Sequence, residues 1–300
     1  MLSANSRQPK TEQAFTLIEL LVVIAIVGIL AGLAVVSMSG ATEAARIAKL
    51  KVYSNSIRNS LMGNRVSEWK FDEGAGTTTA DTVGNNSGIL TGGPSWEPGV
   101  NCVSGRCLSF DGLDDYVSCG NDASLNPANA LTIELWFKMT ERRSLWQTVV
   151  GKYPYSQDYL IFMETGGLYL RYLANVGSVE YRVQSLFQPE LNTWYFVVFT
   201  VDPENLIEKS YINGIFDKST AIPNSLITHT ANPLYFARGG SNYFKGSIDE
   251  TRIYSAALTV SDIREDYLAG LDKLLANGQI TKQDYQQRLA KLNSTYVANK

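Results

Sequence analysis

The acidic residues on the expected strands of this 300-residue chain are the first candidates for chemistry, because a pair of carboxyl groups can hydrolyse a glycosidic bond. A retaining glycosidase needs two carboxyl groups about 5 to 5.5 Å apart, one as nucleophile and one as acid. The alternating segment from Leu131 to Met139 carries a single acid, Glu134. Asp249 and Glu250 are neighbours in sequence, so on a strand they point to opposite faces. The sequence therefore predicts a protein that is not an enzyme.

Few residues of the chain could carry out other catalysis, bind zinc or bind nucleic acid. A Ser-His-Asp mechanism would depend on His229, the only histidine, which stands in Ile-Thr-His-Thr without a recognisable nucleophile motif and is interpreted as a surface-loop residue. Three cysteines and one histidine are too few, at these spacings, for a zinc site. The net charge of −3, with mixed signs, argues against nucleic acid as a partner of the soluble part.

Glu19 is the one charged residue in the apolar run from Phe15 to Met38. A charge near the centre of a spanning helix costs roughly 2.5 to 3.5 kcal/mol, and less toward its ends. At about 1.5 Å of rise per residue, the run is long enough to cross a bilayer. Glu19 is therefore expected to meet a partner of opposite charge.

The order of a polar basic leader, a small residue, Phe15, Glu19 and an apolar run resembles the N-terminus of type IV prepilins. The resemblance implies that a leader of residues 1–14 is cut between Ala14 and Phe15 and that the new amine of Phe15 is methylated. It implies a prepilin peptidase, the inner-membrane assembly machinery and other pilin copies as partners. The implied location is the cytoplasmic membrane for the prepilin and then an extracellular bacterial filament. Ala14 departs from the Gly that the family usually has.

Glu19 is then expected to act in assembly. The ammonium of Phe15 on an incoming subunit can pair with Glu19 of a neighbour, and this attraction grows as the dielectric constant falls. The alternative is an ordinary secretory signal, which has its basic region directly before the apolar core and a small-residue cleavage site after it. No such site follows this run.

Beyond Met38, small and apolar residues recur at helical spacing among charges, so the helix is expected to continue to about Met62 and to stop at Gly63. The assembly helix therefore spans residues 15–63.

The three cysteines indicate an oxidising compartment. Cys102 and Cys107 flank Val-Ser-Gly-Arg, a turn-forming segment, so they are expected to form a small-loop disulfide. Cys119 is left over and is expected to be a buried thiol.

Between Val66 and Leu258 the chain is typical of short strands separated by turns. The segment from Leu131 to Met139 alternates strictly, and Asn213-Gly214 is a strong hairpin signal. Further strands are expected at 168–172, 179–183, 194–201, 207–212, 215–218, 234–237 and 248–254. So many short antiparallel strands predict a two-sheet sandwich or jelly roll.

Four segments within 66–258 resemble laminin G-like, concanavalin A-like jelly rolls. They are Trp69-Lys-Phe-Asp-Glu-Gly-Ala-Gly, Cys107-Leu-Ser-Phe-Asp-Gly-Leu-Asp-Asp-Tyr-Val, the hairpin from Trp194 to Gly214, and Gly246-Ser-Ile-Asp-Glu-Thr-Arg-Ile-Tyr. The resemblance implies the fold, whereas the same sandwich serves lectins, adhesion modules, hydrolases and spacers.

Ligands of this domain are left as alternatives. No cofactor is certain, and calcium is open, because some relatives bind it and it prefers carboxylate and carbonyl oxygens. The candidate ligands are Asp72, Asp111 and Asp249, with Asp114 and Asp115 in the same motif segments. The other interpretation is that these acids form turns, and that Asp249 pairs with Arg252 or caps a loop. For surface glycans, the candidate stacking residues are Trp146, Tyr153 and Tyr155, against the alternative that these rings pack in the core.

Residues 259–300 are expected to form a helical hairpin. Thr259 to Asp262 and Thr281 to Asp284 each match a capping box, and Asn277-Gly278 separates two apolar stripes. The hairpin resembles short C-terminal helical-hairpin domains. It is too small to be stable alone, so its apolar faces should pack on the jelly roll or on a neighbouring subunit.

The fold class is thus α+β by content and mainly β, with a long N-terminal helix, a jelly-roll head and a helical hairpin. The favoured function is a structural subunit of a type IV pilus or pilus-like filament, whose head serves adhesion or surface contact. The alternatives are a pseudopilin of a type II secretion or DNA-uptake apparatus, and a membrane-anchored glycan-binding protein.

Overall fold

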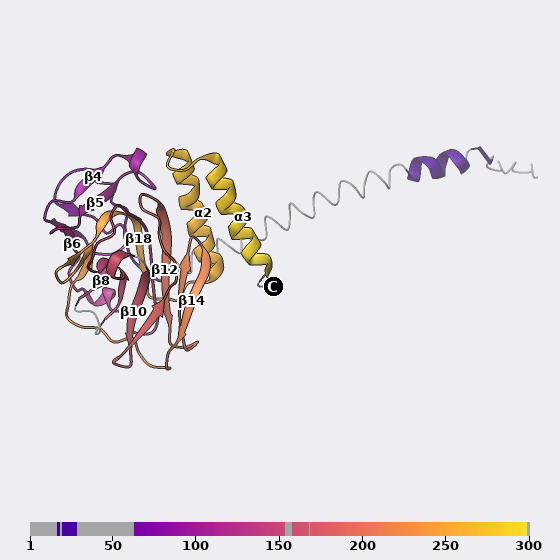
Figure 1. The fold of residues 1–300 in the computed structure, drawn as a ribbon. Coiled ribbons are helices and arrows are strands. Elements are labelled where there is room, and N and C mark those ends of the chain that lie inside the picture. The colour runs from indigo at the N-terminus through magenta and orange to yellow at the C-terminus, as the bar shows by residue number, and fades with distance from the viewer. Residues whose placement is uncertain (1–16, 19, 29–62, 154–157, 168, 299–300) are drawn as a thin grey trace, which may run out of the picture. The chain divides into compact units, whose positions relative to one another are not determined.

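The computed structural model describes residues 17–18, 20–28, 63–153, 158–167 and 169–298, and Figure 1 shows its fold. The chain divides into two compact units, residues 1–59 and 60–300. In the first unit, residues 17–18 and 20–28 are helical and their large apolar side chains are exposed. Across the described segments, no helix combines the length and apolar composition that a bilayer crossing requires. Ala14, Phe15, Glu19 and most of the expected assembly helix lie outside the described residues.

The second unit contains two large antiparallel sheets. The first has the strand order β14-β13-β12-β7-β18-β5-β4, with β1 also paired to β18, and the second has the order β11-β10-β9-β8-β15-β6-β3-β2. β16 and β17 form a separate two-stranded ribbon. The strands of the first sheet are β1 (Arg65–Trp69), β4 (Ser95–Glu97), β5 (Cys107–Asp111), β7 (Leu131–Met139), β12 (Trp194–Asp202), β13 (Ile207–Ile212), β14 (Ile215–Ala221) and β18 (Lys245–Tyr254).

The strands of the second sheet and of the ribbon are β2 (Thr78–Thr79), β3 (Gly88–Thr91), β6 (Tyr116–Ser118), β8 (Gln147–Lys152), β9 (Leu160–Met163), β10 (Leu170–Val176), β11 (Val179–Gln184), β15 (Leu234–Phe236), β16 (Arg238–Gly239) and β17 (Asn242–Tyr243). Short 3-10 helices lie at Gly99–Asn101, Ala123–Leu125 and Thr165–Gly167. Together the two sheets make the sandwich that the sequence predicted.

Alternation along the strands builds the core between the sheets. In β7, Ile133, Leu135 and Phe137 belong to the same buried cluster as core residues of the second sheet. The opposite face of β7 carries Glu134 and Trp136, as expected, yet it is buried too. The first sheet therefore has a second cover on its outward face.

That cover is the helical hairpin of α2 (Val260–Ala276) and α3 (Lys282–Ala298), which lies beside the first sheet (Figure 1). The capping box of Thr259 and Asp262 starts α2, as predicted. Tyr267 of α2 stacks on Trp136, and a Cβ on Gly270 would come within 2.7 Å of the same indole. The indole of Trp136 lies so close to the helix at this position that only glycine fits there. The hairpin thus packs on the jelly roll, one of the two expected alternatives.

Strands β8 and β9 were not predicted from the sequence. Every residue of both strands is buried, so neither shows an alternating pattern. On the outward side of the second sheet, Leu160, Phe162 and Leu173 form a small cluster against which Trp146 packs. Because side chains cover this face locally, these strands lack the alternating polar positions that mark a strand in a sequence.

Glu208 of β13 is a buried acid inside the sandwich. It pairs with Val201, a core residue, and both of its carboxyl oxygens lack a hydrogen-bond partner among the described residues. Burial raises the pKa of Glu208 from 4.5 to about 8. The folded protein therefore keeps this proton while the unfolded chain releases it, and stability falls as pH rises between these two values.

Substitution of Glu208 by Gln is expected to remove this pH dependence. As the pH rises from about 5 to about 7, the free energy of unfolding of the native protein should fall by roughly 2 kcal/mol more than that of Glu208→Gln, since one pKa unit is worth about 1.4 kcal/mol. Urea unfolding at the two pH values measures the difference. Parallel pH profiles for the two proteins would show that Glu208 is ionised in the folded state.

Candidate functional site

The carboxylates considered for hydrolysis are held in a buried ion network. Arg252 donates hydrogen bonds to Glu68 at 2.6 Å, to Glu134 at 2.8 Å and to Glu250 at 2.9 Å. Burial and the nearby Asp266 raise the pKa of Glu134, whereas the charge and hydrogen bond of Arg252 lower it. Glu134 is fully buried, so a substrate has no access to it. The three acids are therefore partners of one internal cation.

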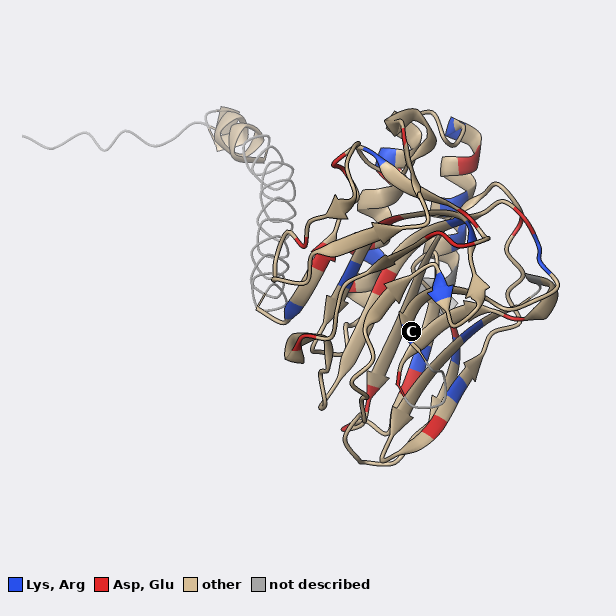
Figure 2. Cartoon of the chain, turned by 90° about the vertical axis from the view of Figure 1, so that its left-hand side faces the viewer, with Lys and Arg blue, Asp and Glu red and all other residues tan. Residues whose placement is uncertain are grey.

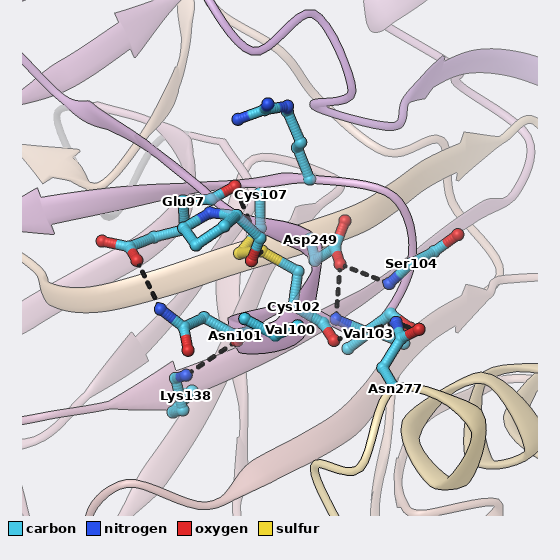
Figure 3. The surroundings of a disulfide bond; sticks show 12 residues. Glu97, Val100, Asn101, Cys102, Val103, Ser104, Cys107, Lys138, Asp249 and Asn277 are labelled. Carbon is cyan, nitrogen blue, oxygen red and sulfur yellow. Dashed lines mark hydrogen bonds between the residues drawn. A yellow bond between two sulfur atoms is a disulfide. The ribbon is translucent and has the colours of Figure 1, made fainter.

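Asp249 holds a loop and does not pair with Arg252. Its Oδ2 accepts hydrogen bonds from the backbone N–H groups of Val103 at 2.9 Å and Ser104 at 3.0 Å (Figure 3). Burial and the neighbouring Glu250 raise its pKa well above the usual range. The predicted pairing with Arg252 is wrong, and the loop-capping alternative is the one that the structure contains.

Asp72 acts on the same loop. Its Oδ1 accepts a hydrogen bond from the backbone N–H of Arg106 at 2.7 Å. Asp72 and Asp249 therefore satisfy three backbone donors of the segment between Cys102 and Cys107. The structure does not gather them with Asp111, the third predicted calcium ligand, since Asp111 groups with other acids.

The disulfide between Cys102 and Cys107 closes this loop, as predicted, and Cys119 is a buried free thiol. The loop touches both the first sheet and the hairpin (Figure 3). Lys138 donates a hydrogen bond to the carbonyl oxygen of Asn101 at 2.9 Å, and Asn277 donates one to that of Val103 at 3.0 Å. The disulfide loop thus ties the helical hairpin to the jelly roll.

Loss of the disulfide is expected to destabilise the head. Closing so short a loop constrains the unfolded chain by about 2 kcal/mol, so the double variant Cys102→Ser, Cys107→Ser should lose about that much in free energy of unfolding. Cys119→Ala is the matched control, and it should respond to a reducing agent as the native protein does. Equal stability of the native protein with and without reductant would contradict this role.

Asp111 lies in an acidic turn with Asp114 and Asp115. Within the described residues, these three form the one group of three or more metal-binding side chains whose ligand atoms all lie within 4.8 Å of one another. Asp115 accepts a hydrogen bond from the backbone N–H of Asp111, and Asp111 accepts one from that of Leu113. Burial, Asp111 and Asp114 raise the pKa of Asp115. Carboxylate oxygens suit calcium, so calcium stays a prediction for Asp111, Asp114 and Asp115, and Asp72 and Asp249 lie outside this group.

The aromatic candidates for glycan stacking are placed as follows. Trp146 packs on Phe162 at 5.5 Å between ring centroids, and a Cβ on Gly240 would touch the ring of Tyr153. Tyr155 lies outside the described residues. Trp146 therefore contributes to packing, while a stacking role for Tyr153 and Tyr155 stays a prediction.

His229 is less exposed than the sequence suggested. Its side chain is 9 % exposed and its Nδ1 lies 2.9 Å from Asp158 Oδ1. Its Nε2 lies 3.0 Å from the carbonyl oxygen of Pro127. The interpretation as a surface residue is wrong, because the histidine joins two loops inside the domain.

Sequence reasoning missed two cavities between the jelly roll and α3. Their volumes are about 440 and 260 Å³, and Glu190, Thr193 and Arg288 line both. The residues come from the loop before β12, the β13–β14 hairpin and α3. The Asn213-Gly214 turn was the only signal for this region, and it does not reveal that a helix lies against it.

Charges of both signs are scattered over the strands and loops of the second unit (Figure 2). This distribution agrees with the mixed signs behind the net charge of −3.

The two antiparallel sheets define a jelly roll of the concanavalin A-like class. A family model described as the concanavalin A-like lectin/glucanases superfamily matches residues 110–264, just over half of the chain. The chain belongs to this superfamily. A second family model, the prokaryotic N-terminal methylation motif, matches residues 9–35. No curated protein matches the chain.

Solved structures of binding domains share the fold. The binding domain of Paraclostridial Mosquitocidal Protein 1 is 15 % identical with a TM-score of 0.59, and the match covers 70 % of this chain and 53 % of that one. The botulinum neurotoxin serotype D ligand binding domain, solved with N-acetylneuraminic acid, is 14 % identical with a TM-score of 0.58, covering 71 % and 52 %. This chain therefore spans about half the length of these toxin domains.

Domain 4 of AbnA, an extracellular arabinanase from Geobacillus stearothermophilus solved with arabinotriose, is 21 % identical with a TM-score of 0.53. The match covers 67 % of this chain and 97 % of that domain. At these identities the likeness shows the fold alone.

Proposed function

We propose that the chain is a structural subunit of a type IV pilus or pilus-like filament, which displays its jelly-roll head for contact with surface glycans. The methylation motif indicates a prepilin-type, membrane-anchored and surface-exposed protein, and the superfamily indicates carbohydrate or surface binding. The observation that carries the proposal is the presence of both features in one chain.

The proposed assembly begins with leader removal. Prepilin peptidase cuts between Ala14 and Phe15, and the new amine of Phe15 is methylated. In the assembled filament this amine pairs with Glu19 of a neighbouring subunit, because both charges are costly in an apolar environment unless they meet. The inner-membrane machinery adds subunits, which are copies of this chain or other pilins.

The proposed domain boundaries follow from this function. Residues 1–14 are the leader, 15–63 the assembly helix, 66–258 the jelly roll and 259–300 the helical hairpin. The packing of α2 and α3 on the first sheet supports treating the last two segments as one head. This head is the part of the subunit that is presented outside the cell.

The proposal is tested on filaments sheared from cells that express the chain. Electron microscopy and mass spectrometry of the sheared material should find filaments that contain this protein. A pseudopilin would remain with the cell envelope and form no long surface filaments. A chain that merely anchors a glycan-binding head would be absent from the sheared fraction and would keep its leader, which would contradict a filament role.

A further inference from the structure

The larger of the two cavities beside α3 has the size and the walls of a small-ligand pocket. Its volume of about 440 Å³ falls in the range of roughly 300 to 1,000 Å³ that is common for such sites. The smaller cavity, of about 260 Å³, continues from it along α3 past Glu190 and Arg288. Together they form an extended site, which we call the hairpin pocket.

Two phenylalanine rings line the hairpin pocket from opposite faces of the first sheet, and each packs against a tyrosine behind it. Phe216 is 45 % exposed and packs edge-on against Tyr211 at 5.9 Å between centroids. Phe187 packs in the same way on Tyr195 at 4.9 Å, and the Tyr195 hydroxyl accepts a hydrogen bond from the backbone N–H of Glu190. These rings offer fixed apolar surfaces, which suit the apolar face of a pyranose ring.

Planar polar groups stand beside the rings. The Oδ1 of Asn213 accepts a hydrogen bond from the backbone N–H of Phe196 at 2.9 Å, which orients its amide and leaves the NH₂ group as a donor. An amide oriented in this way can donate to a sugar hydroxyl. Asp217 bonds to Ser210 on the opposite face of β14 from Phe216, so it does not share that ring's side of the pocket.

The helical hairpin supplies the remaining donor. Arg288 of α3 donates a hydrogen bond to the carbonyl oxygen of Trp194 at 3.2 Å, which holds the guanidinium at the pocket wall with further N–H groups available. Without α3 the pocket would lack this wall. The docking of the hairpin on the first sheet therefore completes the site.

The charges of the hairpin pocket favour a neutral ligand. Glu190, Asp217 and Asp284 line it together with Arg288 and Lys291, so acids are at least as many as bases. An anionic ligand would face three carboxylates, and a cationic one would face two bases. Aromatic surface, planar donors and acceptors, and balanced charge together are typical of a site for an uncharged, hydroxyl-rich ring.

We propose that the hairpin pocket binds a pyranose residue of a neutral glycan, stacked on Phe216 and hydrogen-bonded to Asn213 and Arg288. This inference rests on the proposed glycan-contact function and assigns it to a place in the head that differs from Trp146 and Tyr153.

The test is calorimetric titration of the full chain in a zwitterionic detergent that carries no sugar. The probes are neutral gluco-, manno-, galacto- and xylo-hexasaccharides, with hexagalacturonate as the anionic comparison. At least one neutral probe should bind, with quenching or enhancement of tryptophan fluorescence, because Trp194 lines the smaller cavity.

Substitutions then locate the site. Phe216→Ala and Arg288→Gln should each weaken binding at least about tenfold. The matched controls are Leu145→Ala, at another exposed apolar residue, and Gln286→Ala, on the exposed surface of α3, and both should bind as the native chain does. Unchanged melting temperatures confirm that all four variants are folded.

Three results would overturn the inference. Binding of hexagalacturonate alone would replace the neutral ligand by an anion. Binding of a neutral probe that is unaffected by Phe216→Ala and Arg288→Gln would move the site elsewhere and leave the glycan-contact function standing. Absence of binding by every probe would contradict both a glycan site in the hairpin pocket and the proposed glycan contact. The filament role is tested separately, by the sheared fraction.

Discussion

Arg252→Leu should cost the head about 3 to 5 kcal/mol in free energy of unfolding. The guanidinium is the shared partner of Glu68, Glu134 and Glu250, whose side chains are at most 7 % exposed. Leucine would leave Glu134 buried without its cation, whereas Glu68 would keep Arg65 and Glu250 would keep Lys273. Removal of one partner from a buried ion network is far more harmful than its replacement by an apolar set, because the remaining charges stay desolvated. Equilibrium unfolding in urea measures the loss.

The loss should depend on pH in a defined direction. In the native protein, burial raises the pKa of Glu68, but the hydrogen bond and charge of Arg252 outweigh this and lower it overall. That contribution is present above the unfolded pKa and is lost as pH falls through the folded one. In Arg252→Leu, Glu68 loses the hydrogen bond and charge of Arg252, so burial counts for more and the folded pKa of Glu68 rises. The variant should therefore lie closer to the native protein at about pH 4 than at about pH 7.

Lys245→Leu is the matched control for Arg252→Leu. Lys245 and Glu141 form an ion pair of 2.6 Å in which the side chains are 37 % and 47 % exposed. Loss of such a surface pair should change the free energy of unfolding by less than about 1 kcal/mol. Equal effects of the two substitutions would show that the Arg252 network does not stabilise the head.

Glu19→Val should abolish filament growth without impairing membrane insertion. Valine makes the apolar run from Phe15 to Met38 uninterrupted, so insertion becomes easier. An incoming Phe15 amine, however, would find no counter-charge. A loss of about 1.4 kcal/mol per docking step already reduces the association constant tenfold, and the desolvated amine should lose more. Electron microscopy of sheared material and immunoblots of the membrane fraction provide the two readouts.

Leu20→Val controls for Glu19→Val, because it changes the neighbouring residue of the same run without altering charge. Cells with this variant should produce filaments at the native level. Normal filaments from Glu19→Val would show that the carboxylate is dispensable for assembly.

Local signals in the sequence predicted the elements that have one buried and one exposed face, or a clear turn or cap at one end. β13 was predicted to the residue, Ile207–Ile212, because Asn213-Gly214 fixes the turn that ends it. The capping box at Thr259 likewise placed the start of α2. β8 and β9 were missed because both of their faces are buried, which removes the alternation that marks a strand.

Contacts between distant segments could not be read in the same way. Asp249 binds the loop at Val103 across 146 residues, and the ion network depends on an irregularity of β18 between Asp249 and Arg252, where Glu250 has a φ of 46°. Adjacency of Asp249 and Glu250 correctly argued against a catalytic pair. It gave no indication that both acids serve as internal partners, one of the disulfide loop and one of Arg252.

The hairpin pocket illustrates the same limit for the candidate site. Aromatic residues in exposed loops, such as Tyr153, were the natural glycan candidates from sequence. Phe216 and Arg288 are 72 residues apart and meet at one cavity only because the hairpin returns to the first sheet. A helix whose docking partner is undefined cannot be assigned a role in a pocket.

The most direct test of the account is the mass of the mature N-terminus. The chain is extracted from membranes and from sheared filaments of its native host and its N-terminal peptide is sequenced by mass spectrometry. The account predicts a chain that starts at methylated Phe15 and lacks the fourteen residues before it, in both fractions. A chain that retains Met1 through Ala14 and is found only as an isolated membrane protein would contradict it.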